Sequence, residues 1–361
     1  MSTTAACIEH AQELIRRRDG ADRVLPVAGA TKPALSRAGD GVMAVDVSEL
    51  RGIVEYDPGE LTVTARAATP VAEVADVLAE HGQYLPFDPP LVEAGATLGG
   101  VVAAATSGPN AFRHGGVRDF VIGVRLIDGT ARLVSGGGKV VKNAAGFDLP
   151  KLMVGSRGRL GVITQLSFKV FPRPSATVTH RYGLGLDGAL ETIARLCRGP
   201  ITLDAVDIEP GGHLVIRLGG DVDLLGARSA RLEAEVGAAA EVLGGSVDRD
   251  YWTDVAGFSW VPGGQAVVRA PVPAHLVPRV DAVLEAAGAL VRYSLAGNVA
   301  WIAWPPARPT EVLAAALAGL GLTGVALTGP PLPGPIGAQP GGAFGERVRS
   351  AFDPFDRFAQ D

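Results

Sequence analysis

The sequence is poor in cysteine, with only Cys7 and Cys197 among its 361 residues. Two thiols so far apart form no disulfide framework and indicate a reducing compartment. They are also fewer than the about four thiolates that hold an iron–sulfur cluster. Electrons that leave a redox cofactor in this chain would therefore pass to oxygen, to a diffusible acceptor or to another polypeptide.

Long hydrophobic runs are absent as well, and no stretch is long enough to span a bilayer. Glu9, His10 and Glu13 interrupt the N-terminal region, which does not resemble a signal peptide. These absences predict a cytoplasmic chain without a transmembrane segment. Any peripheral membrane association would come through partner proteins.

Charge of one sign does not accumulate either. The formal net charge is −5, and the only cationic run, Arg16 to Arg18, is expected to be a solvated helix end. Because no basic stripe is present, the sequence predicts no nucleic-acid partner. It also holds no H-E-x-x-H motif and no clustered Cys/His site, so we expect no metal site.

The length predicts two domains, which we place at residues 1–174 and 175–361. The Asp128-Gly129 pair between two apolar runs predicts a hairpin. Pro172-Arg173-Pro174 closes the first domain, because proline cannot extend a strand ladder. In this half, helices are expected at 5–19 and 70–81, and strands at 24–27, 42–47, 53–56, 61–65, 121–127, 131–134 and 161–170.

The second half repeats one order of elements twice, β-α-β-β-α-β, which predicts ferredoxin-like units that share an antiparallel sheet. The first pass comprises strand 178–184, helix 188–198, strands 202–208 and 213–218, helix 223–243 and strand 246–250. The second comprises strand 265–272, helix 274–287, strands 290–294 and 299–303, helix 309–319 and strand 323–328. A last helix is expected at 342–352.

Glycine is plentiful, at 48 residues, and it gathers with other small residues in the segment Gly95–Gly108. Such residues let main-chain N–H groups approach an anion, and threonine and serine add hydroxyl donors, as a pyrophosphate needs. Tight packing between elements would explain the same composition equally well. Two further small-residue segments, Leu25–Lys32 and Gly155–Thr164, favour the phosphate interpretation. Neither a Rossmann fingerprint nor a Walker loop is present, so three loops around one diphosphate imply a different dinucleotide fold.

The order of these segments resembles the FAD-binding domain of the vanillyl-alcohol oxidase/PCMH type. The matching motifs are Pro26–Thr31, Thr97–Gly108, Arg113–Asp119 with His114 at a usual aromatic position, and Gly146-Phe147-Asp148-Leu149 through Ile163-Thr164. Further motifs at Lys142–Ser156 and Phe168–Pro174 bring the chain closest to the FAD-binding E subunits of bacterial glycolate oxidases. The resemblance implies an α+β fold, in which a PCMH-type FAD-binding domain is followed by a ferredoxin-like-repeat cap domain.

The resemblance also places the FAD-binding residues in these loops. They are Val27, Ala28, Gly29, Ala30, Thr31, Lys32, Gly95, Ala96, Thr97, Leu98, Gly99, Gly100, Ala103, Ala104, Thr106, Ser107, Gly108, Gly115, Gly161, Val162 and Ile163.

The first loop has neither the histidine nor the cysteine with which the family attaches flavin covalently, so the expected cofactor is dissociable FAD. Lys32 either pairs with a phosphate or is a solvated loop lysine. Arg157 and Arg159 either approach phosphates or face solvent, and solvent is slightly favoured. His114 is expected to pack beside the flavin or accept a loop hydrogen bond, and Asp148 is expected to cap the helix that follows it.

Catalytic relatives that oxidise 2-hydroxy acids carry H-x-G-D-G-N and G-E-H-G motifs, and this sequence has neither. Its C-terminal half holds only His180, His213 and His275, each isolated, so no catalytic residue is assigned.

The resemblance therefore implies an FAD-binding subunit of a glycolate oxidase/dehydrogenase complex, which oxidises glycolate or another small 2-hydroxy acid together with partner subunits. Those partners would be a larger homologous flavoprotein subunit and an iron–sulfur subunit. A stand-alone FAD-dependent oxidoreductase of a small alcohol or 2-hydroxy acid is one alternative. A flavin-free scaffold is another, since Ala28 and Ala30 replace family glycines.

Overall fold

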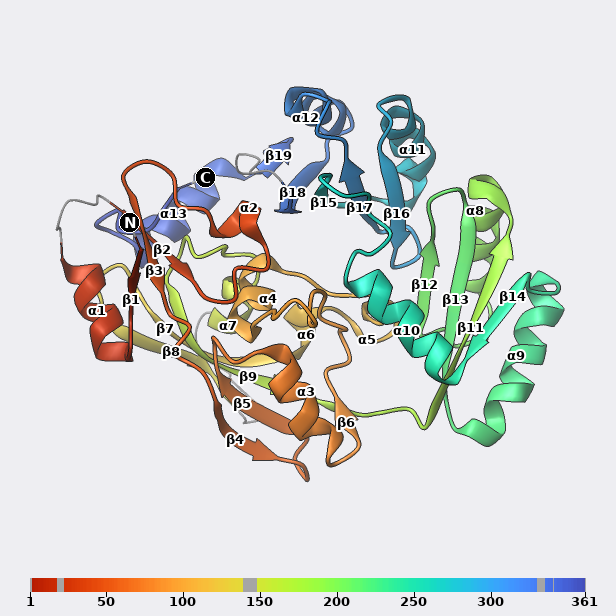
Figure 1. Ribbon diagram of the computed structural model, residues 1–361, viewed down its shortest axis with the longest axis horizontal. Helices are drawn as coiled ribbons and strands as arrows, with labels where there is room; N and C mark the ends of the chain where they lie inside the picture. The colour runs from red at the N-terminus through yellow and green to blue at the C-terminus, as the bar shows by residue number, and fades with distance from the viewer. Residues whose placement is uncertain (1, 18–22, 139–147, 330–334, 340, 361) are drawn as a thin grey trace. The chain divides into compact units, whose positions relative to one another are not determined.

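The computed structural model describes residues 2–17, 23–138, 148–329, 335–339 and 341–360 (Figure 1). The chain divides into two compact units. Unit 1 contains residues 1–107, 116–172 and 340–361, and unit 2 contains residues 108–115 and 173–339. The chain therefore passes between the units next to the expected boundary at residue 174, and also after residues 107, 115 and 339.

The C-terminal segment departs from the sequence prediction, which counted it with the second domain. Helix α13 (Gly342–Phe352) and the residues after it belong to unit 1. The reason is a backbone pairing in which Val24 N–H donates to Arg357 O at 2.7 Å and Ala359 N–H donates to Val24 O at 2.9 Å. Because these partners lie at opposite ends of the sequence, no local pattern predicts their pairing.

Unit 1 is built on two sheets. Three parallel strands form the smaller sheet in the order β1-β3-β2, and five antiparallel strands form the larger sheet in the order β4-β5-β9-β7-β8. A short β6–β10 pair lies apart from both. The strands are β1 (Ser2–Thr4), β2 (Arg23–Val27), β3 (Val42–Asp46), β4 (Ile53–Asp57), β5 (Thr62–Arg66), β6 (Gln83–Tyr84), β7 (Val121–Ile127), β8 (Leu133–Gly137), β9 (Val162–Lys169) and β10 (Phe171–Pro172).

Short helices connect these strands. The expected helix at 5–19 is shorter in the structure, because β1 precedes it and the Cys7 Sγ atom caps its first turn by accepting from His10 N–H. The helix expected at 70–81 is confirmed as α3. The helices of unit 1 besides α13 are α1 (Ile8–Arg16), α2 (Pro33–Ser36), α3 (Val71–Ala79), α4 (Leu98–Ala104), α6 (Val117–Phe120) and α7 (Leu149–Met153).

The predicted hairpin between β7 and β8 is confirmed. One carboxylate oxygen of Asp128 closes its turn by accepting from Thr130 N–H at 2.8 Å and from Arg132 N–H at 3.0 Å. Beneath the sheet, the ring of Phe87 packs against those of Phe120 and Phe168, each with a centroid separation of 5.8 Å. This buried aromatic contact ties the loop that follows β6 to strand β9.

Unit 2 is one nine-stranded antiparallel sheet in the order β14-β11-β13-β12-β16-β17-β15-β18-β19. The first four strands and the next four each have the neighbour pattern of a ferredoxin-like unit, and the two units meet at β12 and β16. The predicted repeat is therefore confirmed. The strands are β11 (Ala176–Gly183), β12 (Ala205–Ile208), β13 (His213–Gly220), β14 (Glu241–Gly244), β15 (Ala266–Pro271), β16 (Leu290–Ser294), β17 (Val299–Trp304), β18 (Thr323–Thr328) and β19 (Pro335–Gly337).

The helices of unit 2 include the crossover helix of each β-α-β pair. Helices α8 and α9 contact β13, while α11 contacts β16 and α12 contacts β18 and β19. The helical elements are α5 (Ala111–His114), α8 (Gly185–Leu196), α9 (Val222–Val236), α10 (Gly245–Ala256), the 3₁₀ turn η1 (Ala274–Leu276), α11 (Val277–Ala286) and α12 (Thr310–Gly319).

The segment 223–250 corrects the sequence prediction, which gave one long helix and then a strand. The helix stops at Val236 because Gly237, with a φ of 103°, ends it, and the strand is β14 instead of 246–250. Residues 246–250 belong to α10. The buried side chains Asp248, Trp252 and Val255 recur at helical spacing. The sequence did not show this period as a hydrophobic pattern, because its first residue is an acid.

Helix α10 is held to the sheet by a buried polar network. Asp248, fully buried, accepts hydrogen bonds from Thr177 at 2.6 Å, Thr179 at 2.5 Å and Arg217 at 2.6 Å. Trp252 on the next turn donates to Thr179 at 2.8 Å. In Figure 1, α10 lies in front of the strands that supply these partners.

The same network continues across the junction of the two repeats. Asp207, fully buried, accepts from the Arg292 guanidinium and from the Ser294 hydroxyl, both at 2.8 Å. Arg292 also donates to the Tyr251 hydroxyl at 3.0 Å, and that hydroxyl donates to Glu209 at 2.7 Å. A buried ion pair therefore joins β12 to β16 where their ladder is one residue long.

We predict that Asp207→Asn lowers the free energy of unfolding of unit 2 by about 3–5 kcal/mol, because it leaves the Arg292 charge buried without its counterion. Urea titration followed by tryptophan fluorescence measures this change. The control is Glu235→Gln, which removes an exposed ion pair with Arg195 and should cost about 0–1 kcal/mol. Equal, small losses in both variants would contradict the assignment of the buried pair.

Candidate functional site

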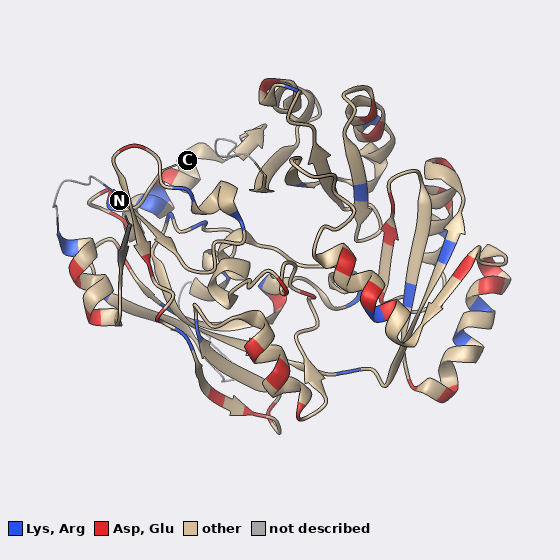
Figure 2. Ribbon diagram, in the orientation of Figure 1, with Lys and Arg blue, Asp and Glu red and all other residues tan. Residues whose placement is uncertain are grey.

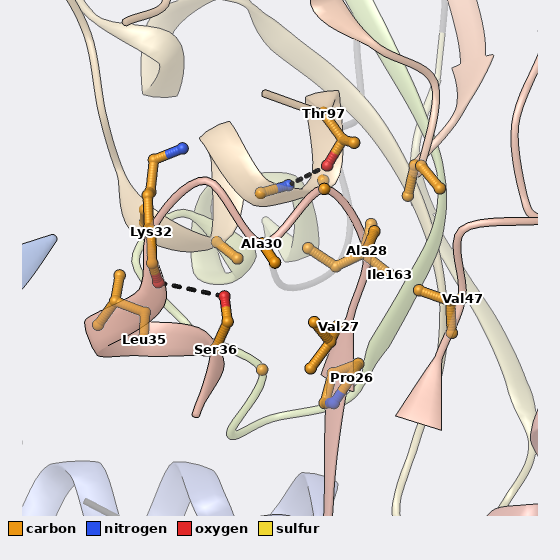
Figure 3. A pocket seen from close by; sticks show the side chains of 18 of the residues that line it. Pro26, Val27, Ala28, Ala30, Lys32, Leu35, Ser36, Val47, Thr97 and Ile163 are labelled. Carbon is orange, nitrogen blue, oxygen red and sulfur yellow. Dashed lines mark hydrogen bonds between the residues drawn. The ribbon is translucent and has the colours of Figure 1, made fainter. Parts of the chain in front are cut away.

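A pocket lies within unit 1, where the loop after β2, the start of α4 and the segment before β9 come together (Figure 3). Its space, including open solvent at the mouth, is about 740 Å³. The lining is made of small and apolar side chains. It comprises Pro26, Val27, Ala28, Gly29, Ala30, Thr31, Lys32, Leu35, Ser36, Val47, Ala67, Ala68, Thr97, Gly99, Gly100, Ala103, Ala104, Arg157, Gly158, Gly161 and Ile163.

The first loop, residues 28–32, follows directly from β2 and offers free hydrogen-bond donors. Within the described part of the chain, the N–H groups of Gly29, Ala30 and Thr31 have no protein acceptor. Ala30 is held at a φ of 47°, a left-handed conformation that costs an alanine about 1–2 kcal/mol. Strain of this kind together with adjacent unpaired donors is typical of a ligand-binding loop.

The second loop, which leads into α4, has its donors already engaged. Gly99 N–H donates to Ala67 O at 2.7 Å, and Leu98 N–H donates to Thr69 O at 3.1 Å. The hydroxyl of Thr97 caps α4 by accepting from Gly100 N–H at 3.2 Å. This loop therefore contributes small side chains that leave room in the pocket, while the free N–H groups come from the first loop.

Two glycines allow the three segments to approach at backbone distance. A Cβ atom on Gly29 would lie 2.5 Å from Gly95 O, and one on Gly99 would lie 2.9 Å from Ala67 O. Neither acceptor can move without shifting its own segment, so any larger residue at Gly29 or Gly99 would separate the walls of the pocket. The glycines are thus required by the protein's own packing before any ligand is considered.

Lys32 supplies the pocket with a charge that has no counterion. The residue is 4% exposed, and among the described residues its Nζ atom has one hydrogen-bond partner, the Thr31 hydroxyl at 3.4 Å. Burial lowers the pKa of Lys32 to about 8. No Asp or Glu lines the pocket, and Arg157 is the second cation in its lining. The chemistry of this donor set, a buried ammonium beside unpaired N–H groups, fits a phosphate or diphosphate.

The third segment brings Arg157 to the pocket, although the sequence slightly favoured solvent for this residue. Arg157 N–H donates to Ala103 O at 2.9 Å, which fastens the segment to α4. Asp148 caps α7 by accepting from Lys151 N–H at 3.2 Å, as predicted. The preceding motif residues Gly146 and Phe147 lie outside the described part of the chain.

Most of the predicted loop residues gather in this pocket, namely Val27, Ala28, Gly29, Ala30, Thr31, Lys32, Thr97, Gly99, Gly100, Ala103, Ala104, Gly161 and Ile163. Others stand behind the lining as buried supports or on connecting backbone. These are Gly95, Ala96, Leu98, Thr106, Ser107 and Val162. The sequence reasoning missed several lining residues that carry no motif, namely Leu35, Ser36, Val47, Ala67 and Ala68, and it did not single out Pro26 and Gly158 within their motifs.

The remaining predicted residues, Gly108 and Gly115, flank α5 in the segment that belongs to unit 2. Arg113 in this segment pairs with Asp204 at 2.5 Å. Burial and then the Arg113 charge lower the pKa of His114, against an opposing effect of Asp204. Burial thus disfavours the charged form of His114, and the structure does not identify a reaction for this residue.

Unit 2 presents four arginines on one face of its sheet, namely Arg181, Arg217, Arg292 and Arg269. Arg292 and Arg269 lie on the same face because both are register partners of Trp301 on the strand between them. Three of the four have carboxylate partners. Arg217 pairs with Asp248, Arg292 with Asp207, and Arg181 with Glu209. The fourth, Arg269, has no ion pair or hydrogen bond to any described residue, and burial alone lowers its pKa.

Metal chemistry finds no support in the described residues, which contain no group of three or more His, Cys, Asp or Glu arranged around a common point. Among the same residues, no helix is both long and apolar enough to cross a membrane. Figure 2 shows Lys and Arg interspersed with Asp and Glu along both units, while α4 and the loops beside it carry little charge. The pocket is therefore a local cationic site in a surface of mixed charge.

Comparison with known proteins agrees with this site. The model of the FAD binding domain family matches residues 4–137, which include the first two loops of the pocket. The chain is 42% identical over 216 residues to the glycolate oxidase subunit GlcE of Escherichia coli K12. It is 28% identical over 206 residues to the glycolate oxidase subunit GlcD of Bacillus subtilis 168. It is also 32% identical over 158 residues to the mitochondrial D-lactate dehydrogenase [cytochrome] 1 of Saccharomyces cerevisiae.

These matches cover only part of each protein. The aligned region spans 60% of this chain and 56% of the E. coli protein, 56% and 42% for the B. subtilis protein, and 42% and 26% for the yeast protein. Among solved structures, alkyldihydroxyacetonephosphate synthase superposes on 98% of this chain and 74% of its own, with a TM-score of 0.70 at 13% identity. This similarity confirms the PCMH-type fold with mixed helix and strand.

We predict that Ala103→Leu weakens FAD retention about tenfold or more, equivalent to about 1.4 kcal/mol of binding free energy. Ala103 lies on α4 and lines the pocket, so a larger side chain there occupies ligand space without opposing the helix. Fluorescence titration with FAD measures the effect. Gly99 does not suit this test, because a side chain there would collide with Ala67 O.

The matched control for this prediction is Ala72→Leu, the same change at an exposed position of helix α3. It should leave both FAD affinity and melting temperature within error of the unaltered chain. If Ala103→Leu kept full affinity while remaining folded, the ligand would not occupy this pocket.

Proposed function

We propose, from the match of residues 4–137 to the model of the FAD binding domain family, that the chain is the FAD-binding subunit of an oxidoreductase that converts glycolate, or a similar small 2-hydroxy acid, to the 2-oxo acid. The observation that carries the proposal is the pocket of unit 1, which holds a buried lysine and unpaired N–H groups and is lined by no acid. Bound FAD would supply the acceptor for the hydride that leaves the hydroxy acid. The chain's own residues would hold its diphosphate and shield it from water.

The proposed attachment of FAD is non-covalent. Covalent attachment needs a nucleophilic side chain at the flavin, and no histidine or cysteine lines the pocket. Lys32 would neutralise one phosphate, and the N–H groups of Gly29, Ala30 and Thr31 would donate to phosphate oxygens. Gly99, Gly100 and Ala103 would leave the room that the cofactor needs.

The proposed partners are a larger, homologous flavoprotein subunit and an iron–sulfur subunit. Two relatives are named as subunits of glycolate oxidase, and they are different subunits of it. The chain has too few cysteines to build a cluster of its own, so its electrons need an external acceptor. The isolated histidines of its second half give no hydroxy-acid motif, which favours a role inside a complex.

The experiment that tests this function is an absorption spectrum of the purified chain before and after acid precipitation. We expect a flavin spectrum that passes entirely into the supernatant, because the cofactor is held only by non-covalent contacts. Co-expression with the flavoprotein and iron–sulfur subunits from the same source should then yield a co-purifying complex that glycolate bleaches. A colourless chain that takes up no added FAD would contradict the proposal and support a flavin-free scaffold.

A stand-alone oxidoreductase is the second candidate, and the observation that favours it is Arg269. This guanidinium is the only one of the four arginines on its sheet face that no described carboxylate neutralises. Desolvated arginine prefers a planar anion that accepts two hydrogen bonds, as a carboxylate does. We propose that Arg269 binds the carboxylate of the hydroxy acid, which would give this chain a substrate contact of its own.

We predict that Arg269→Met weakens the binding of oxalate, a non-oxidisable dicarboxylate, by about 10- to 100-fold, in line with the about 1.5–3 kcal/mol of a charged hydrogen bond. Arg269→Lys should restore part of the loss. Isothermal titration calorimetry measures the affinity without any need for turnover. The exposed Arg279 provides the control, since Arg279→Met should not alter oxalate binding. An unchanged affinity in Arg269→Met would remove the support for a stand-alone enzyme.

A further inference from the structure

Lys32 differs from the other cations of unit 1 in being buried inside a pocket and lacking a counterion. Only 4% of its surface is exposed, and it donates to one neutral group, the Thr31 hydroxyl, at the long distance of 3.4 Å. An ammonium in such a place loses its hydration without gaining a negative partner, so burial lowers its pKa and the group gives up its proton more readily than a lysine in water.

The elements around Lys32 bring no negative charge to it. Helix α4 contains no charged residue, and α2 contains none either. The segment before β9 contributes Arg157 and Arg159, which are both cations. In the adjoining sheet, β3 ends at Asp46, and its carboxylate already accepts from Ser48 N–H at 2.9 Å. Accordingly, burial is the sole cause that lowers the pKa of Lys32.

A diphosphate in this pocket would give Lys32 the negative partner that it lacks among the described residues. It would bring negative charge to the N–H groups of the first loop, which Lys32 directly follows. An anion at hydrogen-bond distance favours the ammonium form and raises the pKa of a lysine. In Figure 3, the Lys32 side chain rises from the same loop as Ala30 beside the start of α4.

We propose that Lys32 binds the FAD diphosphate only as an ammonium, so that FAD binding takes up a proton and weakens at alkaline pH. This inference rests on the proposed function, because it assumes that FAD is the ligand of the pocket. The proton comes from solvent and stays on Lys32 Nζ while the cofactor is bound. The affinity for FAD is then a reporter of the protonation state of one buried side chain.

The sign of the effect follows from linkage. Below pH about 8 the free pocket already holds the ammonium, and FAD binding needs no proton. Above that pH the free pocket holds the neutral amine, so the dissociation constant should rise towards about tenfold for each pH unit. The stability of the FAD-free fold has the opposite dependence on pH. The pKa of Lys32 in this fold, about 8, lies below the about 10.4 of an unfolded lysine, so the free energy of unfolding rises with pH between these two values.

The test is the dissociation constant of FAD for the cofactor-free full chain at pH 6.5, 7.5, 8.5 and 9.5. We expect a constant value to pH 7.5 and about a tenfold increase between pH 8.5 and 9.5 in the unaltered chain. Lys32→Met should bind more weakly at pH 7 and show no such increase. Lys32→Arg, which stays charged throughout, should also lose the increase. Lys169→Met, at an exposed lysine that ends β9, should keep it.

Two further measurements remove other sources of pH dependence. ADP carries a diphosphate, fully ionised between pH 8.5 and 9.5, but no isoalloxazine ring, so the same weakening of its affinity over this range would rule out titration of the ring. Calorimetry at pH 8.5 in buffers of different ionisation enthalpy should show proton uptake in the unaltered chain and none in Lys32→Met.

The outcomes separate this inference from the function beneath it. FAD binding with a pH-independent dissociation constant, or with the same increase in Lys32→Met, would overturn the inference and leave the proposed function standing. Failure to bind FAD at any pH would overturn the proposed function itself.

Discussion

The backbone-to-backbone contacts at Gly29 and Gly99 are the constraint on which the site depends. They set the first loop against Gly95 and the start of α4 against Ala67, at distances that no side chain larger than hydrogen permits. The N–H groups of Leu98 and Gly99 in the second loop are also engaged, because they donate to Thr69 O and Ala67 O in the turn after β5. The first loop keeps unpaired donors, since the N–H groups of Gly29, Ala30 and Thr31 have no acceptor among the described residues. Small residues here thus have two roles, since some allow close contact between backbone segments and others carry N–H groups that remain available to a ligand.

Electrostatics divides the two units in a similar way. In unit 2, buried arginines are neutralised by buried carboxylates, and the resulting network holds α10 and joins the two repeats. In unit 1, the pocket is lined by no acid, and Lys32 has no carboxylate partner among the described residues, so an anion that entered would neutralise Lys32. A desolvated ion pair adds little net stability but is costly to break. An unpaired buried cation costs free energy, and the binding of an anionic ligand can recover that cost. Arg269 is the one arginine of its sheet face that, like Lys32 in unit 1, has no carboxylate partner among the described residues.

The sequence was sufficient to predict the loops, the hairpin at Asp128 and the double β-α-β-β-α-β order, because each depends on local signals such as glycine turns, alternation and capping. It was insufficient where the deciding contact is distant. Only the folded chain shows that Gly99 N–H is spent on Ala67 O, or that the C-terminal segment pairs with β2. Arg157 looked like a surface residue because its approach to the pocket depends on a hydrogen bond to Ala103. The error at 246–250 has another cause, since Asp248 is an acid that faces the core and so breaks the apolar pattern of α10.

The arrangement also bears on how much chemistry this chain can perform alone. Over the first repeat of unit 2, the sheet face is occupied by α10, and its arginines are satisfied by Asp248, Asp207 and Glu209. Polar groups that are already paired in this way have no hydrogen bonds left for a substrate. Buried His180 directly follows Thr179 on β11 and therefore lies on the other face of the sheet, where its Nε2 atom is 3.0 Å from the Ser229 hydroxyl of α9. The paired groups of this face therefore hold α10 and join the two repeats, and Arg269 is the arginine among them that no described carboxylate neutralises.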